Sequence, residues 1–146
     1  MNDLNEIRFN RLVFAGFLTF LSFLMVEWVV ERLIGRALIG DYLAVWHQTL
    51  AVPDWDITNI LLNLFIALVN TTILMWLYAA LRPMFGVGVK TALVTSFFLI
   101  VFMAVFYVNM INLGVYPWEI GLLETIYLLI ELPLAMIVGA RFYEAD

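Results

Sequence analysis

The sequence predicts an all-α integral membrane protein, a four-helix bundle in which each helix crosses the bilayer. Two observations lead to this prediction. Hydrophobic residues make up 65% of the 146-residue chain and charged residues only 13%, whereas a water-soluble domain is about half apolar and about a quarter charged. The apolar residues also gather into four long runs, each near the 20 or so helical residues that span a hydrocarbon core of about 30 Å.

The four runs define the expected membrane spans, and the whole chain, residues 1–146, is expected to form one transmembrane domain. The runs are continuous, whereas the strands of a membrane barrel alternate between apolar and polar residues over about ten positions. An open sheet is excluded because its edges would leave backbone groups unpaired in lipid. The expected spans are residues 12–30, which contain Glu27, residues 57–81 and 91–113, which carry no charge, and residues 118–140, which contain Glu119, Glu124 and Glu131.

A short amphipathic helix is expected between the first two spans, lying along the membrane interface. Its apolar residues recur at helical spacing over residues 37–50, with Asp41 and Gln48 between them. The alternative is a plain connecting loop. Asp56 or Thr58 is expected to cap the second span, because an oxygen-bearing side chain at this position accepts hydrogen bonds from the first turn of a helix.

The link between the second and third spans predicts a tight antiparallel hairpin. Arg82-Pro83 is expected to end the second span, because proline disfavours the helical conformation of the residue before it. Gly86 and Gly88 then allow a compact turn before Lys90. The alternative is a docking loop for a partner. The glycines do not match a phosphate-binding loop, which requires further glycines or a following lysine and hydroxyl residue.

The distribution of basic residues predicts the orientation of the chain. Crossing the membrane four times places five basic residues on one side and only Arg32 and Arg36 on the other. Cytoplasmic loops carry the excess of Lys and Arg, so both termini are expected in the cytoplasm and His47 outside. The five residues on the cytoplasmic side are Arg8, Arg11, Arg82, Lys90 and Arg141.

Composition excludes several classes of function. The chain has no cysteine and one histidine, so a disulfide, a thiolate metal site and a haem held by two histidines of one chain are excluded. The net charge of −5 argues against nucleic-acid binding. No nucleophile–base pair is visible, so no enzymatic activity and no cofactor are expected. An acid-rich metal site formed by Glu27, Glu124 and Glu131 remains open.

The polar residues inside the spans are the candidate functional site, because polar groups in the bilayer are costly and need a partner or a purpose. Helical spacing puts Asn63 and Asn70 on one face of the second span, and Glu124 and Glu131 on one face of the fourth. Topology places most of these residues in the outer half of the membrane, where they would line a pocket open to the outside. The candidate ligand-binding residues are Glu27, Asn63, Asn70, Asn109, Glu124 and Glu131. The alternative is that the asparagines hydrogen-bond between helices and only hold the bundle together.

Glu131 is the most informative residue of this set. It lies about halfway through the fourth span, and no Lys or Arg lies at the same depth. A carboxylate there needs a proton, an ion or water to neutralise it. Pro133, two residues later, removes one backbone hydrogen bond and frees the carbonyl of Leu129.

Residues 76–92, with the sequence WLYAALRPMFGVGVKTA, resemble a segment that joins two spans in an uncharacterised family of small bacterial four-span membrane proteins. An acid late in the first span, here Glu27, is also similar. The resemblance implies a multi-pass protein of the bacterial inner membrane and implies no reaction.

Two functions follow as expectations. The first is a structural, oligomerising or accessory subunit of the membrane, which associates with lipid and with itself or a larger complex. The second is a proton- or cation-coupled transporter, or a binder of a small polar ligand, that uses the outward-open pocket around Glu131.

Overall fold

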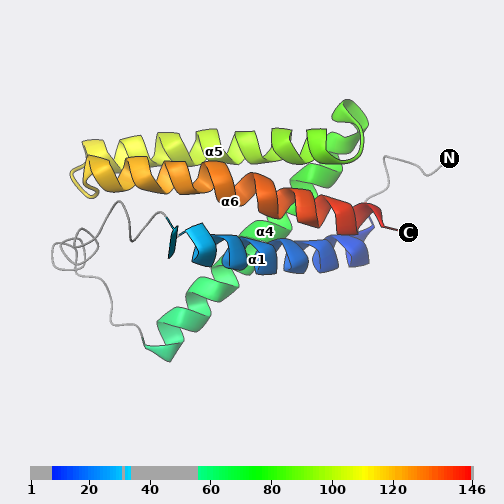
Figure 1. Cartoon of the computed structure of the whole chain (residues 1–146), viewed down its shortest axis with the longest axis horizontal. Helices are drawn as coiled ribbons and strands as arrows, with labels where there is room; N and C mark the ends of the chain where they lie inside the picture. Colours follow the sequence, from blue (N-terminus) through cyan, green and yellow to red (C-terminus); the bar gives the residue numbers. More distant parts are fainter. Residues whose placement is uncertain (1–7, 31, 34–55, 146) are drawn as a thin grey trace.

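The computed structural model describes residues 8–30, 32–33 and 56–145, and these residues fold into four long helices (Figure 1). The helices are α1 (Phe9–Val30), α4 (Ile57–Phe85), α5 (Val89–Asn112) and α6 (Trp118–Glu144). Each is long and apolar enough to cross a membrane. The prediction of a four-helix membrane bundle is therefore confirmed, and the chain is a multi-pass membrane protein. The expected interfacial helix at residues 37–50 and His47 lie outside the described residues.

Three helices lie side by side and the fourth crosses them. In Figure 1, α6 lies between α1 and α5, and α4 runs across this row at a steep angle. Helix α6 contacts each of the other three helices. The start of α1, the link between α4 and α5, and the end of α6 meet at one end of the bundle, which we call the termini end (residues 8–12, 78–91 and 141–145). We call the opposite end, where residues 113–117 join α5 to α6, the hairpin end.

Helix α4 begins where the sequence predicts and ends later. The Asp56 carboxylate accepts a hydrogen bond from the backbone N–H of Asn59 at 2.7 Å, which confirms Asp56 as the cap. The expectation that Arg82-Pro83 ends the helix is wrong, because α4 continues to Phe85. Proline removes only one hydrogen bond from the last turn, and the residue after Phe85 still donates its backbone N–H to the Arg82 carbonyl at 2.9 Å.

Two glycines make the sharp turn between α4 and α5. Gly86 has a φ angle of 86° and Gly88 a φ angle of 98°, a region of backbone space that favours glycine. The Thr91 hydroxyl, in the first turn of α5, donates a hydrogen bond back to the Gly86 carbonyl. The expected compact turn is therefore present, and it brings the start of α5 beside the end of α4.

Small residues allow α1 to pack closely against two helices. A Cβ atom added to Gly139 of α6 would collide with the Thr19 side chain of α1, and it would lie 2.8 Å from the Met75 sulfur of α4. A Cβ atom added to Gly16 of α1 would lie 2.9 Å from the Cα atom of Thr72 in α4. Close approach through small residues is typical of helices in lipid, where van der Waals packing replaces the hydrophobic effect between helices.

The hydroxyl groups inside the bundle are satisfied within their own helices. Each donates to a carbonyl three or four residues earlier, so no hydroxyl of this set needs a partner on another helix. The set comprises Thr19, Thr71, Thr72, Thr95, Ser96 and Thr125.

Candidate functional site

Glu131 is the buried acid of the bundle. It lies on the inner face of α6, and only 3% of its surface is exposed. Its Oε1 atom is buried and has no hydrogen-bond partner among the residues that the structure describes. Buried polar groups are normally hydrogen-bonded, so an orphaned carboxyl oxygen is a feature that needs an explanation.

The packing of α1 against α6 brings Glu27 to the level of Glu131. The two helices are antiparallel neighbours, and Gly139 faces Thr19. Glu27 lies eight residues after Thr19, and Glu131 lies eight residues before Gly139. Equal steps along antiparallel helices cover the same rise, so the two glutamates lie at the same height. Glu27 is close enough to act electrostatically on Glu131.

Glu124 extends this acidic cluster toward the hairpin end. It lies seven residues before Glu131 on α6, it is partly buried, and both Glu27 and Glu131 are within its electrostatic range. The rings of Tyr107 and Tyr116 meet edge to face beside it, with centroids 6.1 Å apart. Burial raises the pKa of Tyr116, in the turn between α5 and α6, and the Glu124 carboxylate raises it further.

The asparagines of the predicted pocket lie away from these acids. Asn63 and Asn70 on α4 and Asn109 on α5 all have exposed side chains. For Asn63 and Asn70 the reason is the steep crossing of α4, whose first half diverges from α5 and α6 (Figure 1). The structure therefore brings together Glu27, Glu124 and Glu131, and it leaves the three amides on the outer surface of the bundle.

The acidic cluster does not have the geometry of a metal centre. Within the described ranges, no group of three or more His, Cys, Asp or Glu residues is arranged to hold a metal ion. The acid-rich metal site that the sequence left open therefore has no geometric support here. What the arrangement offers is three carboxyl groups within electrostatic range of one another, one of them fully enclosed.

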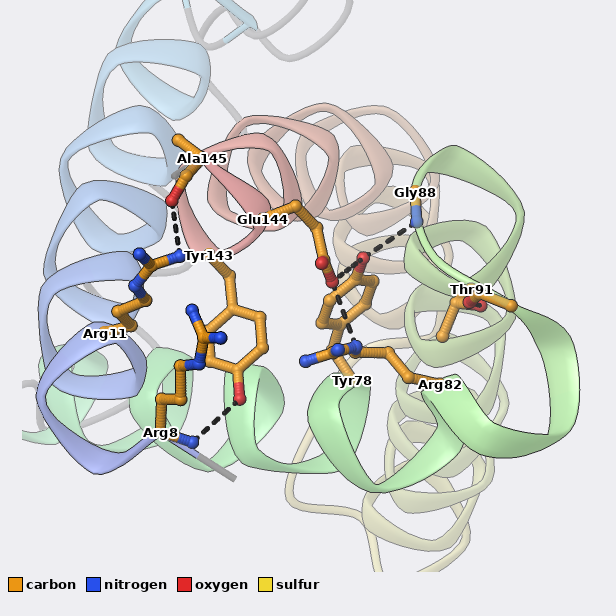
Figure 2. A network of polar contacts seen from close by, with 10 residues as sticks. Arg8, Arg11, Tyr78, Arg82, Gly88, Thr91, Tyr143, Glu144 and Ala145 are labelled. Atoms are coloured by element: carbon orange, nitrogen blue, oxygen red, sulfur yellow. Dashed lines mark hydrogen bonds and ion pairs between the residues drawn. The ribbon is translucent and has the colours of Figure 1, made fainter. Parts of the chain in front are cut away.

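A second polar cluster, at the termini end, centres on an ion pair between a buried arginine and a partly exposed glutamate (Figure 2). Arg82 of α4 is 7% exposed. Its Nε atom lies 3.0 Å from Oε1 of Glu144, at the end of α6. The Tyr78 hydroxyl donates to the same carboxylate oxygen at 3.1 Å and accepts a hydrogen bond from the Gly88 backbone N–H at 2.9 Å. These contacts join the ends of α4 and α6 to the turn before α5.

Tyr143 connects this cluster to α1. The Arg82 guanidinium lies over the Tyr143 ring, 5.1 Å from its centroid, and the Tyr78 ring meets Tyr143 edge to face at 6.0 Å. The Tyr143 hydroxyl accepts a hydrogen bond from the Arg8 backbone N–H at 3.3 Å, and the Arg11 guanidinium donates to the Ala145 carbonyl. Figure 2 shows these residues converging from α1, α4 and α6 beside the turn that leads into α5. We call them, together with Arg82, Glu144, Tyr78 and Gly88, the termini network.

Sequence reasoning missed this network. The sequence predicted only a compact turn between Arg82 and Lys90, yet Tyr78 and Arg82 form the centre of the network. The available signal was their spacing of four residues, which puts them on one face of a helix. Tyr143 and Glu144, directly after the last apolar run, supply the complementary hydroxyl and carboxylate.

The fold and these contacts define the class of the protein as a four-helix, multi-pass membrane protein. Comparison with protein-family models, with curated proteins and with solved structures gives no match to this chain. The function must therefore be argued from the molecule itself.

Proposed function

We propose that this protein is a membrane assembly protein that works as a homo-oligomer, in which two copies pair through the first half of α4 (residues 57–70). The observation that supports this proposal is a long, uncovered helical segment that carries polar amides at membrane depth. The four-helix bundle then serves as the scaffold that holds this segment away from the other helices (Figure 1).

Within the first half of α4, residues 61–66 are not covered by any of the other described helices. All six residues from Leu61 to Ile66 are exposed, whereas a helix packed against a neighbour buries at least one face. Lipid can cover the exposed leucines, isoleucines and phenylalanine, since they are as apolar as its own tails. It cannot hydrogen-bond the amides of Asn63 and Asn70, which lie two turns apart on one face. This face therefore needs a polar partner within the membrane.

A second copy of the same face is the partner that fits. An asparagine amide both donates and accepts hydrogen bonds, so a face with two asparagines can pair with itself about a twofold axis. Residues 57–70 carry no charge, so two copies do not repel each other. Interhelical hydrogen bonds of this kind contribute about 1 kcal/mol each in a membrane, enough to select one face among several apolar ones.

Disulfide crosslinking tests this proposal directly, because the native chain has no cysteine. Ile66→Cys lies about 60° from Asn63 around the helix, and Leu61→Cys lies about 160° away in the same exposed segment. In lipid membranes, we expect oxidation to crosslink Ile66→Cys into a dimer and to leave Leu61→Cys monomeric. Adding Asn63→Leu and Asn70→Leu should abolish the Ile66→Cys dimer. Equal crosslinking of both cysteine variants, or none, would show that this face does not pair.

We also propose that the termini end faces the cytoplasm. Five of the seven basic residues belong to this end of the chain, and excess Lys and Arg mark cytoplasmic segments. Together with the resemblance of residues 76–92, this favours the inner membrane of a bacterium. Val87 is 53% exposed in the turn between α4 and α5. A membrane-impermeant thiol reagent should therefore label Val87→Cys in inverted vesicles and not in intact cells.

A further inference from the structure

We propose that Glu131, together with Glu27 and Glu124, forms a proton-binding site inside the bundle that is loaded from the hairpin end. This inference goes beyond assembly through α4 and does not depend on it. It starts from the one buried carboxyl oxygen that lacks a partner in the described part of the chain.

Within the described helices, an ionised carboxylate at this position would lack a positive counter-charge. Burying a charge is costly unless a counter-charge or hydrogen bonds accompany it, and Glu131 is 97% enclosed. The basic residues within the four described helices are Arg11, Arg82, Lys90 and Arg141, all at the termini end. Arg82 is already paired with Glu144. Arg32, beyond the end of α1, lies over the Trp28 ring at 4.8 Å from its centroid.

The titratable groups that face Glu131 from the neighbouring helices cannot supply that counter-charge. On α1 the group is Glu27, on α5 it is Tyr107, and on α6 itself it is Glu124. The only charged residue of α4 is Arg82, at the termini end. Acids and phenols can exchange protons with a carboxyl group, but they add no positive charge. Because the described acids also lack metal-binding geometry, a proton is the ligand that this cluster fits.

The three carboxyl groups differ in height and in burial. Glu27 is exposed at the height of Glu131, Glu124 is partly buried two turns closer to the hairpin end, and Glu131 is enclosed. A proton taken up at Glu124 from the hairpin end therefore has an acceptor deeper in the bundle, while the opposite route is occupied by the apolar side chains of Leu132, Ala135 and Met136.

Infrared spectroscopy of the full-length protein in lipid bilayers tests the site. A protonated carboxyl group has a C=O stretching band that a carboxylate lacks, and this band moves when the proton exchanges for a deuteron. We expect such a band near neutral pH, we expect it to move in D₂O, and we expect Glu131→Gln to remove it. Glu119→Gln, the same change in the first turn of α6, is the matched control and should leave the band intact.

A second variant separates a proton site from a packed, inert acid. Glu27→Gln removes a neighbouring negative charge, so the Glu131 band should disappear at a lower pH than in the unmodified protein. This variant decides the question even if Glu131→Gln does not fold. The proposal is overturned if no band depends on Glu131, if the band is unchanged in D₂O, or if its pH midpoint is unmoved by Glu27→Gln.

Discussion

The two ends of the bundle use similar polar residues with opposite results. At the termini end, residues of α1, α4, α6 and the turn before α5 meet, and the Glu144 carboxylate contacts both the Arg82 guanidinium and the Tyr78 hydroxyl (Figure 2). At the hairpin end, α4 diverges, Asn63 and Asn70 are exposed, and the buried Oε1 atom of Glu131 has no hydrogen-bond partner among the described residues. The termini end therefore joins the helices to one another, and both proposals place their polar groups toward the hairpin end.

The difference between the two ends shows that the role of a glutamate in this bundle depends on which helices meet around it. The residue type is the same at both ends. Glu144 lies beside a guanidinium and a phenol because the ends of α4 and α6 meet. The described groups within electrostatic range of Glu131 are two acids and a phenol. The same residue type therefore stabilises one end and leaves an unsatisfied group at the other.

The largest effect is expected from breaking the ion pair of the termini network. Arg82→Met keeps most of the side-chain volume but leaves the Glu144 carboxylate without its guanidinium. Removing one partner of a fully buried ion pair costs about 3 kcal/mol or more, but the Glu144 side chain is 27% exposed and can be partly solvated. The free energy of unfolding in mixed micelles should therefore fall by about 2 to 3 kcal/mol. Arg141→Met changes an exposed arginine of the same end and should cost far less. Equal losses would mean that the ion pair does not hold this end.

A smaller loss of stability is expected when alanine replaces a glycine at a close contact between helices. This loss, too, should be greater near the termini end than near the hairpin end. Gly139→Ala would place a methyl group against Thr19 and the Met75 sulfur, and overpacking of this kind costs about 2 kcal/mol. Gly121→Ala, near the hairpin end, meets the tip of the Ile111 side chain at 2.8 Å, which can rotate away. Thermal unfolding of the two variants checks the order, and a larger loss for Gly121→Ala would contradict it.

The smallest loss of stability is expected from removing single hydroxyl groups of the termini network. Tyr78→Phe removes the bond to Glu144 and leaves the Gly88 N–H without its acceptor, which should lower the free energy of unfolding by about 1 kcal/mol. Tyr143→Phe removes only a longer bond from the Arg8 N–H, at 3.3 Å, and should cost less. Both variants keep the ring contact, so a difference between them measures the hydrogen bonds. If Tyr143→Phe cost more, the centre of the network would lie on α1.

The number of membrane-spanning helices could be predicted because each helix depends only on the residues of its own segment. A run of about 20 apolar residues can satisfy its backbone in lipid only as a helix. The cap at Asp56 was predictable for the same local reason. The end of α4 was not, because Arg82 and Pro83 lie in a turn that the network and the Gly86 N–H hold in helical form.

The candidate site was predictable only in part. The seven-residue spacing of Glu124 and Glu131 puts them on one helix face, and topology brings Glu27 to their side of the membrane. The position of a residue along its helix can thus be counted from the sequence. Asn63, Asn70 and Asn109 were expected at a depth similar to that of the acids. However, the tilt of α4 carries Asn63 and Asn70 outward, and the side chain of Asn109 on α5 is exposed.

Four helices long enough to cross a membrane, the position of each polar residue along its helix, and the grouping of the basic residues can all be deduced from the sequence. Those properties depend on the length and charge of single segments. Which polar groups meet depends on how the helices pack. Lipid tails are as apolar as leucine, so hydropathy does not specify how a helix is rotated or tilted. Close contacts at Gly16 and Gly139 set those angles, and they bring Arg82 to Glu144 while leaving Glu131 without a counter-charge in the described part of the bundle.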